Sequence, residues 1–375
     1  MKRRLSLVAT VLCCCLAFGA CANNQNHTQK DPSGTSIDRV KTKLDVLKPI
    51  AYSSVNGLSL EPGSYISIIG RYSDDSYWKE VEAGAKQAVA DLNAMLGYKG
   101  DKKIKLTYSA PEIRDDVNEQ VNILDEELSR EPIAIGIAAI DTTACTIQFD
   151  LAAENNIPII TFDSGSDYQH VASHIATDNI AATQTAATQL AYAIEEEGEV
   201  VVFVQDSVSM TAKQRLQGFL DTISSKFPNI KVAEVYKFDQ LNAMREAIAN
   251  EKNAVAEDLT QDDVIQYIIE KYPNLKGIYA TNLDTTQAVA KVLKKMDKNN
   301  LKFVGFDGGN EQMKLLEDGT LEGLIIQNPY GIGYATVVAA VRVSLGLANE
   351  SYVNSGYTWI TKENMNTKEI KGMIY

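Results

Sequence analysis

Cysteine is scarce in this sequence, with five residues among 375. Three of the five stand at 13–15, inside an apolar run at the N-terminus. Cys21 and Cys145 are the other two, so a framework of several disulfides is excluded. We expect Cys145, whose apolar neighbours follow a helical pattern, to be a small core residue.

Histidine is rarer still, with three residues in the chain. His170 and His174 stand four apart, a spacing that suits a metal site on a helix, but the run at 157–162 predicts strand and loop in this region. No third ligand stands nearby, and the glycines at 305–309 are too closely spaced for a dinucleotide-binding fingerprint. We therefore expect no metal, no cofactor and no catalytic residue, which argues against an enzyme.

Positive charge is also in short supply. Lysine and arginine total 36 against 49 aspartate and glutamate residues, and the net charge is −13. An acidic chain is repelled by nucleic acid and by anionic lipid headgroups. We therefore expect no nucleic-acid partner, and the sequence has no basic helix-turn-helix pattern that would suit a transcription regulator.

The first residues predict export. A basic start at 2–4 precedes an apolar run at 5–18, as in a secretory signal peptide over residues 1–20. The ending Phe18-Gly19-Ala20-Cys21 is similar to a bacterial lipobox. That resemblance implies a lipidated Cys21 that anchors the protein to the bacterial membrane, at the cell surface or in the periplasm. Ordinary cleavage beside an incidental cysteine is the alternative.

The residues after Cys21 predict a connection between anchor and fold. Residues 22–36 are polar and typical of a flexible tether, and Ile37–Leu47 predicts a short helix. We assign 21–60 to the lipidated cysteine and the flexible tether. The role of 37–60 is not readable from its pattern.

Beyond residue 60 the chain alternates between two patterns. Short apolar runs rich in β-branched residues predict buried strands, and longer runs with apolar residues three and four apart predict helices. This alternation requires parallel strands with right-handed crossovers. Within Asn156–Asn179 the chain ends one strand, Pro158–Phe162, forms another at His174–Ala176, and opens a helix. We interpret this stretch as a crossing between two similar lobes.

The predicted fold class is therefore α/β, with two doubly wound α/β lobes whose parallel sheets are joined by a hinge of several crossings. We expect the lobes to be formed by 61–176 plus about 328–352, and by 177–327 plus about 353–375. The acidic segment 251–262 predicts a surface insertion or a helix extension of unknown role.

Polar and aromatic residues follow almost every predicted strand. Ligands of open α/β sheets bind at the carboxyl ends of strands, so these residues are candidates for one site. Carboxylates and amides suit hydroxyl groups, which both donate and accept, and aromatic rings suit the C–H faces of a sugar. Helix capping is the alternative, and it accounts for Asp206, Thr142 and Asp178.

Several motifs, in order along the chain, resemble those of periplasmic-binding-protein-like sugar receptors of the ribose/galactose type. The resemblance covers the chain from about Tyr65 to the end and implies the type I periplasmic binding protein fold. The motifs are Asp75-Ser76-Tyr77-Trp78, Ile157–Asp163, His174–Asn179, the Tyr-Ala-Thr-Asn run ending at Asn282, Val304–Gly308, Gln327-Asn328-Pro329 and Trp359–Asn364.

The resemblance implies roles for individual residues. The implied hydrogen-bonding residues of the first lobe are Asp75 and Asp163, those of the second lobe are Asn282, Asp307 and Gln327, and the implied packing residues are Tyr77, Trp78 and Phe238. Many members have arginine where this chain has Ser164, and the second-lobe arginine of the family falls at Lys213 or, alternatively, Arg215. Because arginine makes planar, bidentate contacts that serine and lysine cannot make, ribose itself is not implied as the ligand.

The resemblance implies a monomeric, non-enzymatic, lipid-anchored receptor. It would bind a monosaccharide-like ligand between the lobes and deliver it to the permease of an ABC importer. The alternative is a receptor that presents its ligand-bound form to a membrane sensor kinase, and the sequence does not distinguish the two.

Overall fold

The structure, a computed structural model, describes residues 36–298 and 300–375. The predicted signal peptide, Cys21 and the polar run at 22–35 lie outside the described residues. Within these described ranges, no helix combines the length and apolar character that a bilayer crossing requires.

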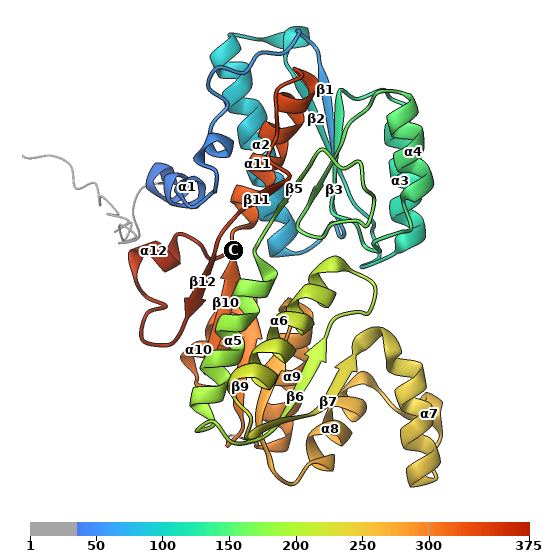
Figure 1. The fold of residues 1–375 in the computed structure, drawn as a ribbon, viewed down its shortest axis with the longest axis vertical. Coiled ribbons are helices and arrows are strands. Elements are labelled where there is room, and N and C mark those ends of the chain that lie inside the picture. The colour runs from blue at the N-terminus through green and yellow to red at the C-terminus, as the bar shows by residue number, and fades with distance from the viewer. Residues whose placement is uncertain (1–35, 299) are drawn as a thin grey trace, which may run out of the picture. The chain divides into compact units, whose positions relative to one another are not determined.

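The first lobe is built on a parallel six-stranded sheet (Figure 1). Its strands, in spatial order, are β11 (Tyr352–Asn354), β5 (Ser173–Ala176), β4 (Ile159–Phe162), β3 (Ala134–Ile137), β1 (Tyr65–Ile69) and β2 (Lys105–Ser109). Ile66 and Ile68 of β1 share a core with α2 (Ser76–Leu96) and α11 (Pro329–Ser344). Ile69 belongs to a second core with α3 (Val117–Leu128) and α4 (Thr146–Glu154). Because neighbouring side chains on a strand face opposite sides, helices cover both faces of this sheet.

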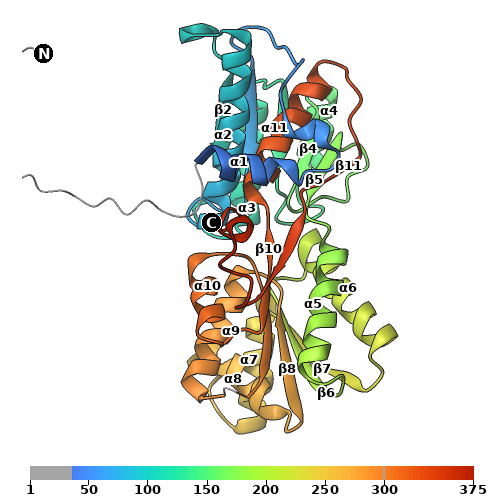
Figure 2. The same ribbon diagram turned by 90° about the vertical axis from the view of Figure 1, so that its left-hand side faces the viewer.

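The second lobe repeats this plan. Its strands, in spatial order, are β12 (Tyr357–Ile360), β10 (Gly323–Gln327), β9 (Lys302–Phe306), β8 (Leu275–Ala280), β6 (Gly198–Val204) and β7 (Ile230–Lys237). One face is covered by α5 (Asn179–Ala193) and α6 (Met210–Lys226). The other is covered by α7 (Leu241–Lys252), α8 (Gln261–Lys271), α9 (Leu283–Met296) and α10 (Asn310–Glu317), and Figure 2 shows the two sets of helices on opposite sides of the strands.

The fold class predicted from the sequence is confirmed, with one difference. β12 runs antiparallel to β10, and the other strand pairs of both sheets are parallel. The antiparallel strand arises because the chain returns from β11 of the first sheet directly to the edge of the second, with no helix between.

The chain passes between the two sheets three times, after β5, after β10 and after β11. Side-chain hydrogen bonds join the three crossings. The hydroxyl of Thr177 donates to Gln327 Oε1 at 2.8 Å, and the amide of Asn328 donates to the carbonyl of Ser355 at 3.1 Å. These bonds make the crossings one hinge of three connected segments.

We had expected a flexible tether over 21–60. The described part of this segment, before β1, is instead packed against the first lobe. It forms α1 (Ser36–Asp45) and a 3₁₀ turn, η1 (Ile50–Ser53). Leu47, Tyr52 and Leu58 are buried in the core beside α11. The hinge residue Asn328 also donates to the carbonyl of Lys43 at 2.6 Å. The sequence predicted the short helix at 37–47 but not the packing after it, because Tyr52 and Leu58 follow no helical or strand period.

The acidic stretch 251–262 lies at the surface and partly extends two helices, in line with the expectation, whereas two short elements were not predicted. The acidic stretch 251–262 is divided between the end of α7, a 3₁₀ turn at Ala256–Asp258 and the start of α8, and it is largely exposed. β11 and α12 (Lys368–Lys371) were not predicted. Elements of three or four residues are too short to show a period in the sequence.

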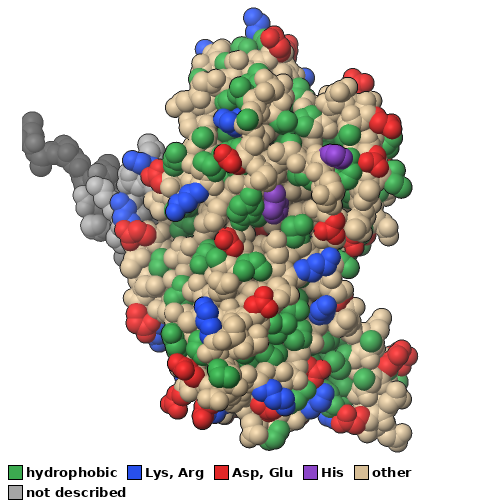
Figure 3. All heavy atoms as spheres, in the orientation of Figure 1, with side chains coloured by type: hydrophobic (Ala, Val, Ile, Leu, Met, Phe, Trp, Pro, Cys, Tyr) green, Lys and Arg blue, Asp and Glu red, His purple; other side chains and the backbone are tan. Residues whose placement is uncertain are grey.

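Cys145 and His174 take structural positions. Cys145 is buried, as expected for a core residue, and burial raises the pKa of its thiol to about 12. His174 Nδ1 lies 2.9 Å from the Thr161 hydroxyl, and burial lowers the pKa of the imidazole to about 4. Across the residues that the structure describes, no three metal-ligating side chains are grouped as in a metal site. On the face drawn in Figure 3, acidic and basic side chains are interspersed, without an extended basic patch.

Helices α2 and α11 cross at two glycines, which yields a test of the fold. A Cβ at Gly333 would lie 1.9 Å from the carbonyl oxygen of Val81, and one at Gly84 would lie 2.0 Å from that of Tyr330. Gly333→Ala should therefore force the helices apart and lower the free energy of unfolding by about 2–3 kcal/mol. Urea unfolding measures the change. Alanine favours an exposed helix by about 1 kcal/mol relative to glycine, so a stabilised variant would contradict the close crossing.

Candidate functional site

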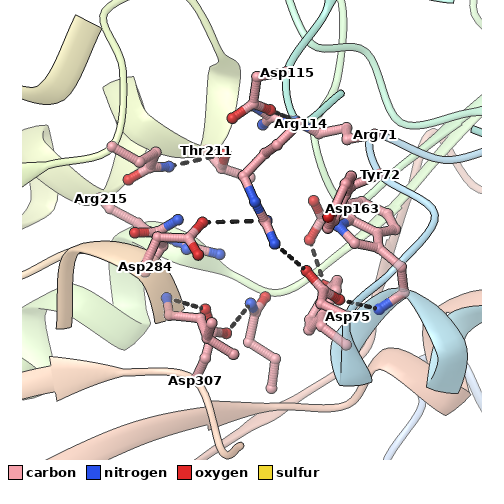
Figure 4. Close-up of a pocket in the computed structure, with 16 residues that line it drawn as sticks. Arg71, Tyr72, Asp75, Arg114, Asp115, Asp163, Thr211, Arg215, Asp284 and Asp307 are labelled. Atoms are coloured by element: carbon pink, nitrogen blue, oxygen red, sulfur yellow. Dashed lines mark hydrogen bonds and ion pairs between the residues drawn. The ribbon is translucent and has the colours of Figure 1, made fainter. Parts of the chain in front are cut away.

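A cavity lies at the carboxyl ends of the strands, between residues of both lobes (Figure 4). Both sheets direct the loops after their central strands toward it, as expected at the switch points of doubly wound sheets. The first lobe contributes Arg71, Tyr72, Asp75, Tyr77, Trp78, Arg114, Asp115 and Asp163. The second lobe contributes Gln205, Thr211, Arg215, Asn282, Leu283, Asp284, Asp307 and Gln327.

Two aspartates occupy equivalent backbone positions in the two lobes. Asp163 follows β4 with a φ of 54°, and Asp307 follows β9 with a φ of 75°. This left-handed region is uncommon for residues other than glycine, although aspartate tolerates it better than most. The neighbouring strands hold the backbone there: Asp163 N donates to the carbonyl of Ile175 at 2.9 Å, and Asp307 N to that of Ile325 at 2.7 Å. The sheets thus support a strained turn that leaves both carboxylates on the cavity wall.

Asp163 presents an acceptor in a buried setting. The hydroxyl of Tyr77 donates to one of its carboxylate oxygens. The second oxygen accepts no hydrogen bond from the described residues, although Asp163 lines the cavity. Burial raises the pKa of Asp163, while Arg215, the Tyr77 hydroxyl and Arg71 act in the opposite direction. A ligand hydroxyl that donates to this oxygen would satisfy it.

Asp307 is held by three donors from the protein. One oxygen accepts from Gln327 Nε2 at 2.7 Å and from the hydroxyl of Tyr375 at 3.1 Å. The other accepts from the backbone N–H of Leu283 at 2.8 Å. Donors on both oxygens fix the direction of the carboxylate.

Arg215 and Asn282 supply donors from the second lobe. Arg215 Nε donates to Asn179 Oδ1 and Nη1 to the carbonyl of Thr281, both at 2.8 Å, and the guanidinium lies 3.9 Å from the ring centre of Phe306. Asn282 caps α9, and its Oδ1 accepts from Thr285 N at 3.0 Å. Within the described structure, Arg215 Nη2 and the Asn282 amide N–H groups donate to no protein acceptor. They remain available to a ligand.

The first turn of α2 forms an aromatic wall. Asp75 caps this helix by accepting from Trp78 N at 2.8 Å. The cap places Tyr77 and Trp78 at the cavity, where their rings meet edge-on with centroids 5.1 Å apart. The indole also meets the ring of Phe162, the last residue of β4, at 6.4 Å. One capping residue thus orients both aromatic side chains.

Two arginines that the sequence analysis did not single out join the lobes (Figure 4). Arg71, just after β1, contacts Asp115 at 2.5 Å and Asp206 of the second lobe at 3.3 Å. Burial lowers the pKa of Arg71, but these two carboxylates outweigh burial and the net pKa is raised. Both arginines follow predicted strands. Their position after a strand was the signal in the sequence that could have identified them as site residues.

The second of these arginines, Arg114, bridges the mouth of the cavity. Its guanidinium contacts Asp75 at 2.9 Å and Asp284 of the second lobe at 3.1 Å, and it lies 4.2 Å from the ring centre of Tyr72. Burial raises the pKa of both Asp75 and Asp284, and Arg114 opposes that rise in each. Arg114, Asp75 and Asp284 also line an outer groove, so Arg114 forms part of the wall between groove and cavity.

Most of the residues proposed from the sequence lie at the cavity. The structure brings together Asp75, Tyr77, Trp78, Asp163, Arg215, Asn282, Asp307 and Gln327. Gln327 also accepts from the hinge residue Thr177, so its amide is oriented from both sides.

Ser164, Lys213 and Phe238 do not line the cavity. Ser164 is fully buried, and its hydroxyl has no partner among the described residues. Lys213 stands two residues from Arg215 on α6, about 200° around the helix, so the two cannot face the same way. Its Nζ lies 3.2 Å from the hydroxyl of Thr142 in the first lobe. Phe238 packs on Tyr236, with ring centroids 5.7 Å apart.

The described geometry agrees with comparisons to known proteins. The family model for the periplasmic binding protein domain matches residues 66–348. The ribose import binding protein of Escherichia coli is 25% identical over 206 residues, which is 55% of this chain and 64% of that protein, less than two thirds of its length. The D-apiose import binding protein of Paraburkholderia graminis is 25% identical over 270 residues, 71% of this chain and 77% of that protein.

Two solved structures share the fold over most of the chain. A carbohydrate transporter solute-binding protein from Agrobacterium radiobacter, in complex with D-arabinose, has a TM-score of 0.71 and 29% identity, covering 83% of this chain and 99% of that chain. An ABC transporter solute-binding protein from Agrobacterium vitis, bound with α-D-tagatopyranose, has a TM-score of 0.70 and 27% identity over the same shares. The family match over most of the chain, the two doubly wound lobes and the cavity between them show that this protein belongs to the periplasmic binding protein family, in its type I form.

Proposed function

We propose that this protein binds a monosaccharide or a similar polyhydroxy ligand in the cavity and delivers it to an ABC importer. The observation that carries the proposal is the set of unused groups on the cavity wall. Asp163 has an unused acceptor oxygen, and Arg215 and Asn282 have unused N–H groups among the described residues. Acceptors from one lobe and donors from the other suit hydroxyl groups, which need both.

The ring of such a ligand also fits the cavity chemically. The C–H faces of a pyranose or furanose pack well on aromatic rings, and Tyr77 and Trp78 line the cavity. Hydrogen bonds from hydroxyls to the carboxylates of Asp163 and Asp307 would be charge-assisted, and therefore stronger than neutral ones. The named ligands of the similar proteins, among them ribose, apiose, arabinose and tagatose, support this class.

The charges of the cavity favour a neutral ligand. Five aspartates and three arginines line it. Arg71 and Arg114 are already paired with carboxylates. Of the three, only Arg215 lacks a carboxylate partner among the described residues, and it faces both Asp163 and Asp307. An anionic sugar would be repelled by the remaining carboxylates. We therefore infer a neutral sugar or polyol in preference to a sugar acid or sugar phosphate.

Binding would proceed by closure of the lobes about the hinge. The Arg71–Asp206 and Arg114–Asp284 pairs join the lobes at the cavity, and both must separate when the cleft opens. A ligand that bonds Asp163 from one side and Asn282 from the other would add to these contacts in the closed form. The closed form would then dock on the permease or, in the alternative that we keep, on a sensor kinase.

We also propose where the protein acts and how. It is a monomer held outside the cytoplasm by a lipid on Cys21, and it acts as a binding protein without enzymatic activity. Permease and ATPase genes beside this gene would favour transport over the sensor-kinase alternative.

A thermal-shift screen tests the ligand class. Protein that begins after Cys21 is melted with pentoses, hexoses and polyols, and with amino acids and nucleosides for comparison. A ligand at 100 times its Kd stabilises the folded form by about 2.7 kcal/mol, so one sugar or polyol should raise the Tm by several degrees. Asp163→Ala and Asp307→Ala should each abolish that rise. Shifts by amino acids or nucleosides alone would contradict the proposal.

Replacing Asp163 by asparagine should separate binding from stability. Burial raises the pKa of this carboxyl, so its ionised form destabilises the ligand-free fold above the pKa of the unfolded chain. That cost disappears as the pH falls below the unfolded pKa. Asp163→Asn should therefore make ligand-free protein more stable at pH 7 and leave it nearly unchanged at about pH 3.5, near the pKa of an ordinary aspartate. Asparagine also tolerates the left-handed backbone.

Urea unfolding at both pH values, and sugar titration at pH 7, measure the two effects of Asp163→Asn. The variant should lose most of its sugar affinity. A less stable variant at pH 7 that still binds sugar would show that this carboxylate supports the fold and not the ligand.

Cys21→Ser tests the anchor. The serine variant cannot be lipidated, so it should leave the membrane fraction and become soluble outside the cytoplasm. Detergent partitioning and metabolic labelling with a clickable fatty acid measure the change, with Cys145→Ser as a matched control that keeps its lipid. Equal membrane retention of both variants would contradict lipidation at Cys21.

A further inference from the structure

Tyr375, the last residue of the printed sequence, reaches the cavity residues from a segment outside the family match at 66–348. After β12 the chain continues through α12 and returns to the carboxyl ends of the second sheet. There the backbone N–H of Tyr375 donates to the carbonyl of Gly308 at 3.4 Å. The side chain is 8% exposed.

The phenol of Tyr375 uses both its donor and its acceptor. Its hydroxyl donates to Asp307 Oδ1 at 3.1 Å and accepts from the backbone N–H of Gly308 at 3.0 Å. Burial, and then the neighbouring Asp307, raise the pKa of Tyr375 well above its ordinary value. The phenol therefore keeps its proton and remains a donor to the carboxylate at any physiological pH.

The ring of Tyr375 faces the other lobe. It meets the ring of Tyr77 edge-on, with centroids 5.5 Å apart and planes at 76°. Tyr77 in turn donates to Asp163. The two tyrosines thus form a continuous chain of contacts from the carboxylate of the second lobe to that of the first.

We propose that Tyr375 is a positioning residue for ligand binding: it aims the Asp307 carboxylate at the ligand and connects it, through Tyr77, to Asp163 of the opposite lobe. Tyr375 does not line the cavity itself, so it acts through these two residues. The proposal rests on the proposed function, because it takes Asp307 as an acceptor of ligand hydroxyls.

A simpler alternative is that Tyr375 only fills space, since it also belongs to the core cluster of the first lobe. The two roles differ in the hydroxyl. A space-filling ring would be replaced equally well by phenylalanine, whereas a positioning residue would not. Tyr375→Phe keeps the ring contact with Tyr77 and removes only the bonds to Asp307 and Gly308.

The binding experiment uses Tyr375→Phe with Tyr357→Phe as a matched control. The control loses a hydroxyl that donates to the carbonyl of Ala181 at 3.1 Å, in the same lobe but outside the cavity. Both are titrated calorimetrically with D-ribose, D-arabinose and D-tagatose. For the sugar that binds wild type, Tyr375→Phe should lower the affinity by about tenfold, as expected for the loss of a hydrogen bond to a charged group. The control Tyr357→Phe should lower it by less than about twofold.

A panel of monodeoxy analogues of the bound sugar separates positioning from a general loss of structure. In wild-type protein, the analogue that lacks the hydroxyl bound to Asp307 has already lost this contact. Tyr375→Phe should therefore leave the affinity for that analogue unchanged while weakening the others. Equal weakening across the whole panel would overturn the proposal.

A double-mutant cycle on ligand-free protein tests the contact independently of any sugar. Urea unfolding is compared for wild type, Tyr375→Phe, Asp307→Asn and the double variant. The hydroxyl and the carboxylate should be coupled, with the double variant differing by about fivefold or more in the unfolding equilibrium constant from the additive value. Additive effects would overturn the proposal. If wild type binds none of the three sugars, the sugar function fails for them, whereas this cycle still tests whether the Tyr375 hydroxyl holds the Asp307 carboxylate.

Discussion

Two buried aspartates determine how this protein is built around its cavity. Asp163 and Asp307 are removed from water, and a buried carboxylate is unfavourable unless donors or positive charge compensate it. The compensation comes from distant parts of the chain: Tyr77 and Arg215 near Asp163, and Gln327, Leu283 and Tyr375 at Asp307. One oxygen of Asp163 accepts no hydrogen bond from the described residues, so the compensation at this carboxylate is incomplete.

The hinge and the binding site share one hydrogen-bonded network. The amide of Gln327 donates to Asp307 and accepts from Thr177, and these two contacts lie in different segments of the chain. A rotation of the lobes that moves Thr177 relative to Gln327 would therefore disturb the hydrogen bond that holds the Asp307 carboxylate. Under the proposed function, ligand binding and lobe closure would be coupled, because Gln327 contacts both Asp307 and the crossing at Thr177.

Local patterns explain what the sequence predicted and what it did not. The strands ending at Phe162 and Phe306 were readable because buried parallel strands are continuous apolar runs, and the aspartates that follow them were therefore candidates. The pairing of Arg71 with Asp206 was not readable, since it depends on how one lobe meets the other. Ser164 was expected at the cavity because it is next to Asp163, yet the left-handed turn at Asp163 turns it into the lobe.

Arg114 joins the two lobes at the mouth of the cavity. Its guanidinium lies between carboxylates of the two lobes, Asp75 and Asp284, and over the ring of Tyr72. Burial raises the pKa of both carboxyl groups, the negative charge of Asp75 raises that of Asp284 further, and Arg114 opposes the rise in each. Asp75 also caps α2 and thereby sets the aromatic wall. Asp75, which orients the wall, is therefore also a partner of the arginine that joins the two lobes at the mouth.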